Sequence, residues 1–163
     1  LRNGMAEVIK TAAIRDEKFF SFLEKSGRIT DFSYPVRCCA EIKAEIVSKD
    51  VNEKGLRKLL NFGHTVGHAI EASSTGLLHG ECVAVGMVYM SGGEAQRRIC
   101  GLLEKYGLPT ACNVPDDVLI EKIIHDKKSA GEYITVVYMD EIGKPQLVVR
   151  KKTELSGLSR GGM

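Results

Sequence analysis

Apolar residues recur at helical spacing along most of the first 125 positions of the chain. Near the start, Met5, Val8, Ile9 and Ala12 form one stripe, which predicts a helix over residues 4–14. The same periodicity predicts further helices over residues 16–25, 36–49, 102–106 and 115–125. Short polar or glycine-containing stretches separate these segments. The pattern therefore predicts a mostly α-helical chain.

The segment 81–99 differs from the others because its first half is apolar on every side. A helix of this kind is normally buried all round, so we place it in the core. We expect Gly92 and Gly93 to break or kink it. Two later runs, 133–139 and 146–150, are rich in β-branched residues and are joined by a turn-forming stretch, which predicts a small β-hairpin near the C-terminus.

Composition narrows the class of protein. With 163 residues, 44% of them hydrophobic, the chain can form one globular domain, and its net charge of +2 argues against a nucleic-acid-binding arm or a membrane-surface helix. No apolar run reaches the roughly 20 residues that span a bilayer. The five cysteines lack C-x-x-C spacing, which is typical of reduced thiols in a cytoplasmic protein. Because the chain does not begin with Met, we expect a piece of something longer.

Three of the four histidines lie between residues 55 and 81. His64 and His68 are four residues apart, so on a helix they project from the same side. If one helix runs unbroken through this segment, Arg57, Asn61 and Glu71 join them in a single polar stripe. A solvated helix face carries Lys and Glu more often than Asn and two His, so the stripe is a candidate site.

Spacing alone leaves the role of the stripe open. An H-x-x-x-H pair can bind zinc, but the glutamate of the H-E-x-x-H motif is missing. Taken alone, such a pair is more often two hydrogen-bonded histidines than a metal site. Gly63 and Gly67 would let a backbone or ligand approach closely. His79 precedes an apolar helical run, and a helix N-terminus favours the neutral, metal-binding imidazole. Glu7 and Lys10, three residues apart, read as a surface ion pair.

Four segments together resemble a known family. In order they are GMAEVIKTAAI, KAEIVSKDVNEKGLRKLLNFGHTVGHAIEA, LLHGECVAVGM and DKKSAG with the β-run that follows it. They resemble the C-terminal domain of 3-dehydroquinate synthase, and LNFGHTVGHAIE followed by LHGE is the most specific part. The resemblance implies one helical metal- and substrate-binding domain over residues 1–163, with a small hairpin. It also implies that an N-terminal NAD-binding α/β domain is missing, since no G-x-G-x-x-G follows a strand here.

The resemblance assigns roles to individual positions. It implies that Glu7, His64 and His79 hold one divalent zinc, or cobalt, with positions left for substrate oxygens. His68 would then handle protons beside the substrate, and Glu53 matches an acidic proton acceptor. The positions implied to bind the substrate's carboxylate and phosphate are Lys10, Lys43, Arg57, Asn61 and either Lys127 or Lys128. Lys127 is the better candidate of the last two. No cofactor-binding residue is expected in this chain.

The implied activity is that of a phosphorus–oxygen lyase of the shikimate pathway of aromatic amino acid biosynthesis. It converts 3-deoxy-D-arabino-heptulosonate 7-phosphate to 3-dehydroquinate and phosphate through NAD-assisted oxidation, phosphate elimination, reduction and aldol cyclisation. The family implies a cytoplasmic homodimer without nucleic-acid or membrane partners. Because NAD is held mainly by the missing domain, we expect the isolated chain to be inactive.

Three alternatives share parts of this pattern. Another sugar-phosphate cyclase, such as one making inosose or valiolone precursors, would keep the same metal ligands. A glycerol-type dehydrogenase would share the fold but has no need of the phosphate- and carboxylate-binding residues. A non-catalytic helical module could retain the motif without the chemistry, and loss of zinc binding would support that reading.

Overall fold

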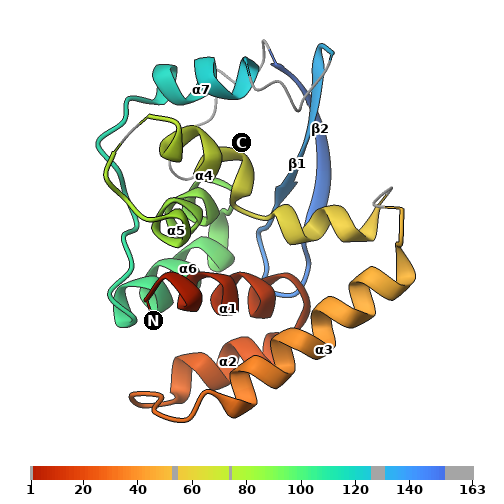
Figure 1. Ribbon diagram of the computed structural model, residues 1–163, viewed down its shortest axis with the longest axis vertical. Coiled ribbons are helices and arrows are strands. Elements are labelled where there is room, and N and C mark those ends of the chain that lie inside the picture. The colour runs from red at the N-terminus through yellow and green to blue at the C-terminus, as the bar shows by residue number, and fades with distance from the viewer. Residues whose placement is uncertain (1, 53–54, 74, 126–130, 153–163) are drawn as a thin grey trace.

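The computed structural model of the chain describes residues 2–52, 55–73, 75–125 and 131–152 (Figure 1). The elements in chain order are α1 (Arg2–Arg15), α2 (Glu17–Lys25), α3 (Ser33–Lys49), the 3₁₀-helix η1 (Leu56–Asn61), α4 (His64–Glu71), α5 (His79–Tyr89), α6 (Gly93–Lys105), α7 (Asp116–Ile124), β1 (Tyr133–Tyr138) and β2 (Gln146–Lys151). The prediction of a mostly helical chain with one small hairpin is confirmed. Over these ranges, no helix is long and apolar enough to cross a membrane.

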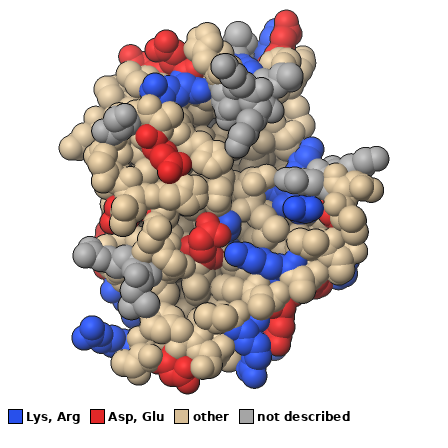
Figure 2. Space-filling view, viewed as in Figure 1, with Lys and Arg blue, Asp and Glu red and all other residues tan. Residues whose placement is uncertain are grey.

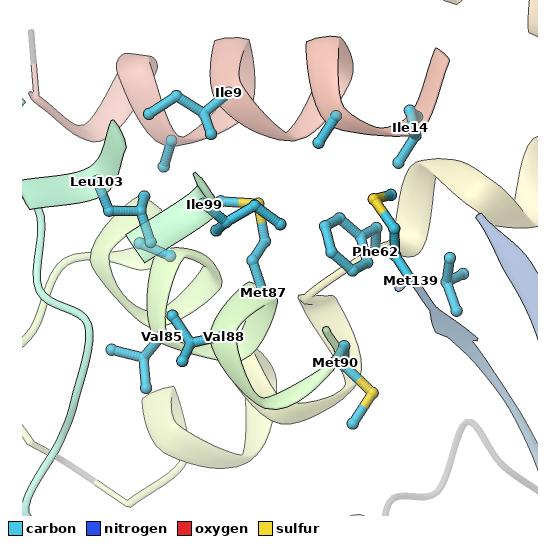
Figure 3. Close-up of a cluster of buried hydrophobic side chains, with 14 of the residues drawn as sticks. Ile9, Ile14, Phe62, Val85, Met87, Val88, Met90, Ile99, Leu103 and Met139 are labelled. Atoms are coloured by element: carbon cyan, nitrogen blue, oxygen red, sulfur yellow. The ribbon is translucent and has the colours of Figure 1, made fainter. Parts of the chain in front are cut away.

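Helix α5 is the centre of the core, as its all-apolar sequence predicted. Nearly every residue from Gly80 to Tyr89 is buried, and the helix packs most extensively against α4 and α1. In Figure 3, Met87 of α5 lies among side chains that include Ile9 of α1, Ile99 of α6 and Phe62. Burial on several sides at once holds α1, α4 and α5 in fixed relative positions, and these are the helices that carry the candidate ligands.

The hairpin lies along one side of the helical body (Figure 1). β1 and β2 pair antiparallel, in a register that runs from Tyr133 opposite Lys151 to Tyr138 opposite Gln146. Backbone hydrogen bonds attach the hairpin to the end of α5: the Met139 N–H donates to the Met90 carbonyl oxygen at 3.1 Å. The predicted hairpin is therefore confirmed, and it is anchored to the core.

Two predicted helix boundaries are wrong. The predicted separate helix over residues 102–106 is the last part of α6, which continues to Lys105 and is followed by Gly107 at a φ of 68°. The third helix begins at Ser33, before Pro35, because proline is tolerated in the first turn, where no intrahelical N–H bond is needed. The predicted break at Gly92 and Gly93 is confirmed, since α5 ends at Tyr89 and α6 begins at Gly93.

The chain around the histidines does not form the single unbroken helix that the polar stripe would require. Residues Leu56–Asn61 form the 3₁₀-helix η1, and Gly63 adopts a left-handed conformation with a φ of 77° before α4 begins at His64. Arg57 and Asn61 therefore belong to a different element from His64, His68 and Glu71. A left-handed residue ends a right-handed helix, and glycine accepts this conformation without steric cost.

Candidate metal and substrate site

Three potential metal ligands converge from three helices. Glu7 comes from the middle of α1, whereas His64 and His79 are the first residues of α4 and α5. One ligating atom of each lies within 4.8 Å of the other two. One carboxylate oxygen and two imidazole nitrogens form the donor set of a catalytic zinc site with positions left open for substrate. The three residues that the family resemblance assigned to the metal are thus neighbours in the structure.

Close packing of α4 against α5 brings His64 to this position. A Cβ atom built on Gly63 would lie 2.8 Å from the Val83 carbonyl oxygen, and one on Gly67 would lie 3.1 Å from the Val83 Cα. On α5, a Cβ at Gly86 would meet the backbone of Gly63, 2.9 Å from its carbonyl carbon. The expectation that Gly63 and Gly67 allow a close approach is confirmed, and the partner is the backbone of α5.

A second close approach joins α1 to the start of α5. The Gly80 N–H donates a hydrogen bond to Asn3 Oδ1, and a side chain at Gly80 would collide with the backbone of Asn3. Asn3 lies one helical turn before Glu7 on α1, and Gly80 follows His79 directly. This contact therefore sets the distance between Glu7 and His79. No local sequence pattern marks Asn3 as part of the site, because only the fold brings these helix ends together.

Glu7 is surrounded by positive charge and has one oxygen without a hydrogen bond. Its Oε2 accepts a hydrogen bond from Lys10 Nζ at 2.9 Å and lies 3.7 Å from Lys43 Nζ. Its Oε1 is buried, has no hydrogen-bond partner, and lies 3.6 Å from His64 Nε2. Burial alone would raise the pKa of Glu7, but the charge and hydrogen bond of Lys10, with smaller contributions from His64 and Lys43, hold this pKa below its usual value.

An unpaired buried carboxylate oxygen needs a physical explanation, because buried polar atoms normally have a partner. A cation between Glu7 Oε1 and the neighbouring imidazole nitrogens would supply one.

The prediction that Glu7 and Lys10 form a surface ion pair is wrong in one respect. The pair exists, but only 3% of Lys10 is exposed. Burial lowers the pKa of Lys10, while Glu7 opposes that shift.

His64 is held in the form that can bind a metal. Its Nδ1 lies 3.2 Å from the Phe62 carbonyl oxygen, so an Nδ1–H can donate there and leave the lone pair on Nε2, the nitrogen nearest Glu7. Burial, followed by the positive charge of Lys10, lowers the pKa of His64 to about 4. The imidazole is therefore neutral at pH 7, as a metal ligand must be.

The other two histidines complete a compact cluster. The His68 ring centroid lies 5.5 Å from that of His64 and 5.9 Å from that of His79. His79 begins α5, as predicted, and its Nδ1 lies 3.1 Å from Glu71 Oε2. His68, Glu71 and His79 also have ligating atoms within 4.8 Å of one another. Over the part of the chain that the structure describes, this group and the Glu7 group are the two candidate sets of metal ligands.

The predicted substrate-binding residues are brought together only in part. Lys10 and Lys43 meet at Glu7, close to the histidines. Asn61 lines a cavity of about 350 Å³ together with Lys58, Thr65 and residues of the hairpin. Arg57 contacts the preceding turn: its backbone N–H donates to Asp50 Oδ2 at 2.9 Å. Figure 2 shows acidic and basic side chains side by side near the middle of this face, where α1, α3 and η1 approach one another.

Three further predictions concern residues outside the described ranges. Glu53, predicted to accept a proton, and Lys127 and Lys128, the alternative substrate-binding lysines, are not described by the structure. Their roles remain predictions.

The fold and the site together define a helical domain with a candidate metal centre of one carboxylate and two imidazoles. Residues 4–129 match the family model of the 3-dehydroquinate synthase C-terminal domain. The chain belongs to this family.

Curated relatives agree with the family match. The chain is 39% identical over 165 residues to the 3-dehydroquinate synthase of Thermodesulfovibrio yellowstonii, a match covering 89% of this chain and 46% of that protein. It is 40% identical over 184 residues to pentafunctional AROM polypeptide 1 of Lodderomyces elongisporus, covering 88% of this chain and 12% of that protein. The chain thus spans less than half the length of these relatives.

Solved structures share the fold. A 2-deoxy-scyllo-inosose synthase complexed with carbaglucose-6-phosphate, NAD+ and Co2+ is 26% identical, with a TM-score of 0.73 over 93% of this chain and 49% of that one. The 2-epi-5-epi-valiolone synthase of Streptomyces hygroscopicus, with NAD+ and Zn2+ bound, is 23% identical, with a TM-score of 0.77 over 96% of this chain and 49% of that one. The second likeness concerns the fold alone.

Proposed function

We propose that this chain is the metal- and substrate-binding part of a 3-dehydroquinate synthase. The whole enzyme would convert 3-deoxy-D-arabino-heptulosonate 7-phosphate to 3-dehydroquinate and phosphate. The observation that carries the proposal is the convergence of Glu7, His64 and His79, with ligating atoms within 4.8 Å and a buried Glu7 oxygen that lacks a hydrogen bond. The family match over residues 4–129 supports it independently.

The cofactors would supply chemistry that side chains lack. Bound zinc would act as a Lewis acid on adjacent substrate hydroxyl groups, and NAD, held mainly by another part of the longer protein, would accept a hydride and return it. Cobalt fits the same donor set, and one structural neighbour contains it.

The residues of this chain would position substrate and protons. Glu7 stays ionised, and His64 stays neutral because burial lowers its pKa to about 4, so both are ready to coordinate at pH 7. Lys10 and Lys43 would attract the negatively charged groups of the substrate toward this site. Asn61 lines the cavity that also includes Thr65, the residue after His64. His68 lies near the other two imidazoles, where it would accept or return a substrate proton.

The remaining assignments follow from the family resemblance. Arg57 would bind an anionic group of the substrate, together with Lys127 or Lys128, and Glu53 would accept a proton. The protein would act as a homodimer in the cytoplasm, and this chain alone would not turn over. Light scattering on the purified protein tests the dimer.

The first experiment is to measure zinc in the dialysed chain and in His64→Ala and His79→Ala variants. One zinc per chain that is lost in both variants supports the metal site. In a second assay, the chain is given 3-deoxy-D-arabino-heptulosonate 7-phosphate and NAD, and phosphate release is measured. Phosphate release and dehydroquinate formation by this chain alone would contradict the proposal that turnover also requires the rest of the enzyme.

A sister sugar-phosphate cyclase is the alternative that the structural neighbours favour, because the 2-deoxy-scyllo-inosose synthase shares the fold at 26% identity. The relatives at 39% to 41% identity over most of the chain include three 3-dehydroquinate synthases, which favours the first reading. A substrate panel offered to the longer protein decides between them: turnover of a hexose phosphate or a heptulose phosphate lacking a carboxylate would establish the sister activity.

A further inference from the structure

Glu71 contacts one of the candidate metal ligands from outside the ligand set. It is the last residue of α4, and His79 is the first residue of α5. The loop between the two helices folds back so that Glu71 Oε2 lies 3.1 Å from His79 Nδ1. The contact is at hydrogen-bond distance, and it joins the Glu71 carboxylate to His79 through the Nδ1 nitrogen of the ring.

A hydrogen bond at one ring nitrogen determines what the other nitrogen can do. If Nδ1 carries the proton and donates it to the carboxylate, the lone pair resides on Nε2 and is available to a metal. The carboxylate also holds the ring in one orientation and makes the imidazole a stronger ligand. His64 has the equivalent arrangement, because its Nδ1 lies 3.2 Å from the Phe62 carbonyl oxygen.

The two histidines need this support to different degrees. The side chain of His64 is 17% exposed, so packing already restricts its ring. The side chain of His79 is 43% exposed and sits at a helix start, where packing restricts it less. A hydrogen bond to an ionised carboxylate is also stronger than one to a backbone carbonyl. The less buried ligand is therefore paired with the stronger acceptor.

We propose that Glu71 is a positioning residue that orients His79 through Nδ1 and so raises the metal affinity of the Glu7–His64–His79 site. This inference rests on the proposed function, because it requires that site to bind zinc. It gives Glu71 no direct contact with metal or substrate. The competing arrangement, in which His68, Glu71 and His79 themselves ligate a second ion, predicts a different stoichiometry.

The test compares two glutamates near the same helix start. Glu71→Ala removes the acceptor for His79 Nδ1, whereas Glu81→Ala removes a different contact, the 2.9 Å hydrogen bond that Glu81 Oε2 accepts from the Leu78 N–H at the start of α5. Both substitutions remove one negative charge, so Glu81→Ala controls for charge and for fraying of α5. Glu71→Gln adds a third case, because its amide oxygen can still accept a hydrogen bond without carrying a charge.

The measurement is zinc affinity by competition with a chromophoric chelator, with circular dichroism to verify that each variant is folded. We expect Glu71→Ala to bind zinc 10- to 100-fold more weakly, roughly the effect of removing such an outer hydrogen-bond partner. Glu71→Gln should fall between Glu71→Ala and the unmodified chain, and Glu81→Ala should stay close to the unmodified chain. Long-range proton–nitrogen NMR of the zinc-bound chain should show His79 protonated at Nδ1 and coordinated through Nε2.

Each other outcome overturns the inference in a distinguishable way. If the unmodified chain binds no zinc, both this inference and the proposed metal site fail. If it binds one zinc and Glu71→Ala binds equally well, or Glu81→Ala is weakened to the same extent, only the role of Glu71 fails. If the chain binds two zinc ions and Glu71→Ala binds one, Glu71 is a ligand of a second site.

Discussion

A methyl group added at Gly86 would press directly on the backbone that presents His64. The Cβ of Gly86→Ala would lie 2.9 Å from both the Gly63 carbonyl carbon and the Gly67 backbone nitrogen, and closer still to the Gly63 carbonyl oxygen. Carbon atoms in contact normally stay about 3.5 Å or more apart. The atoms that must yield belong to the backbone, which cannot rotate away as a side chain can. Helices α4 and α5 must therefore separate.

The size of the effect follows from two opposing terms. Overpacking of this kind costs about 1–3 kcal/mol, and rigid backbone neighbours place Gly86→Ala at the upper end. Replacing a helical glycine by alanine returns about 1 kcal/mol of helix propensity. The net loss is about 2 kcal/mol, which for a chain of this size lowers the melting temperature by about 4–8 °C. Because α4 carries His64 and α5 carries His79, zinc affinity should fall as well.

The assay is urea unfolding followed by circular dichroism, with Gly101→Ala as the matched control. Gly101 lies within α6, is exposed, and has no atom within 4 Å of the position where a Cβ would be added. Alanine there should stabilise the chain by about 0.5–1 kcal/mol. The two glycine-to-alanine changes should therefore act in opposite directions. If Gly86→Ala is as stable as Gly101→Ala and binds zinc normally, the close approach of α4 to α5 does not hold His64 in place.

Three other expectations follow from single contacts. Tyr89→Phe removes the 2.7 Å hydrogen bond from the buried hydroxyl to Asp116 Oδ1, so the free energy of unfolding, measured in urea, should fall by about 1–3 kcal/mol. Tyr133→Phe is the control: Tyr133 is 60% exposed, so this change should leave stability unaffected. Equal effects of the two substitutions would refute the reasoning. Hydrogen bonds, first from Arg15, lower the pKa of Glu45 from 4.5 to about 2. Its contribution to stability is therefore complete above about pH 4.5 and lost as the pH falls through about 2, so Glu45→Gln should remove part of the acid dependence of stability between pH 5 and 2. Removing zinc with EDTA should lower the melting temperature, because a ligand at 100 times its Kd stabilises the folded state by about 2.7 kcal/mol; an unchanged melting temperature would contradict a native-state metal site.

The helical class, the buried α5 and the hairpin could be read from local patterns, because burial requires a periodicity that is visible over ten to twenty residues. The break at Gly92 and Gly93 was visible for the same reason. The continuation of α6 through residues 102–105 was not visible, because it depends on the packing of Leu102 and Leu103, which are buried in the core. The left-handed Gly63 was equally hidden, since its conformation depends on the approach of α5.

The sequence by itself determined which residue types are available for chemistry. Three features lie within short segments and are therefore visible in the sequence: the His64–His68 spacing, the position of His79 at a helix start and the ordered family motifs. Only the tertiary structure decided which of these residues meet. Glu7 and His79 are separated by 71 intervening residues, so no local pattern relates them, and Lys10 looked like a surface residue until the fold buried it. Their meeting depends on contacts such as Asn3 with Gly80 and Gly86 with Gly63, which exist only because α1, α4 and α5 share one core. Long-range packing creates the site from residues whose chemistry the sequence had already specified.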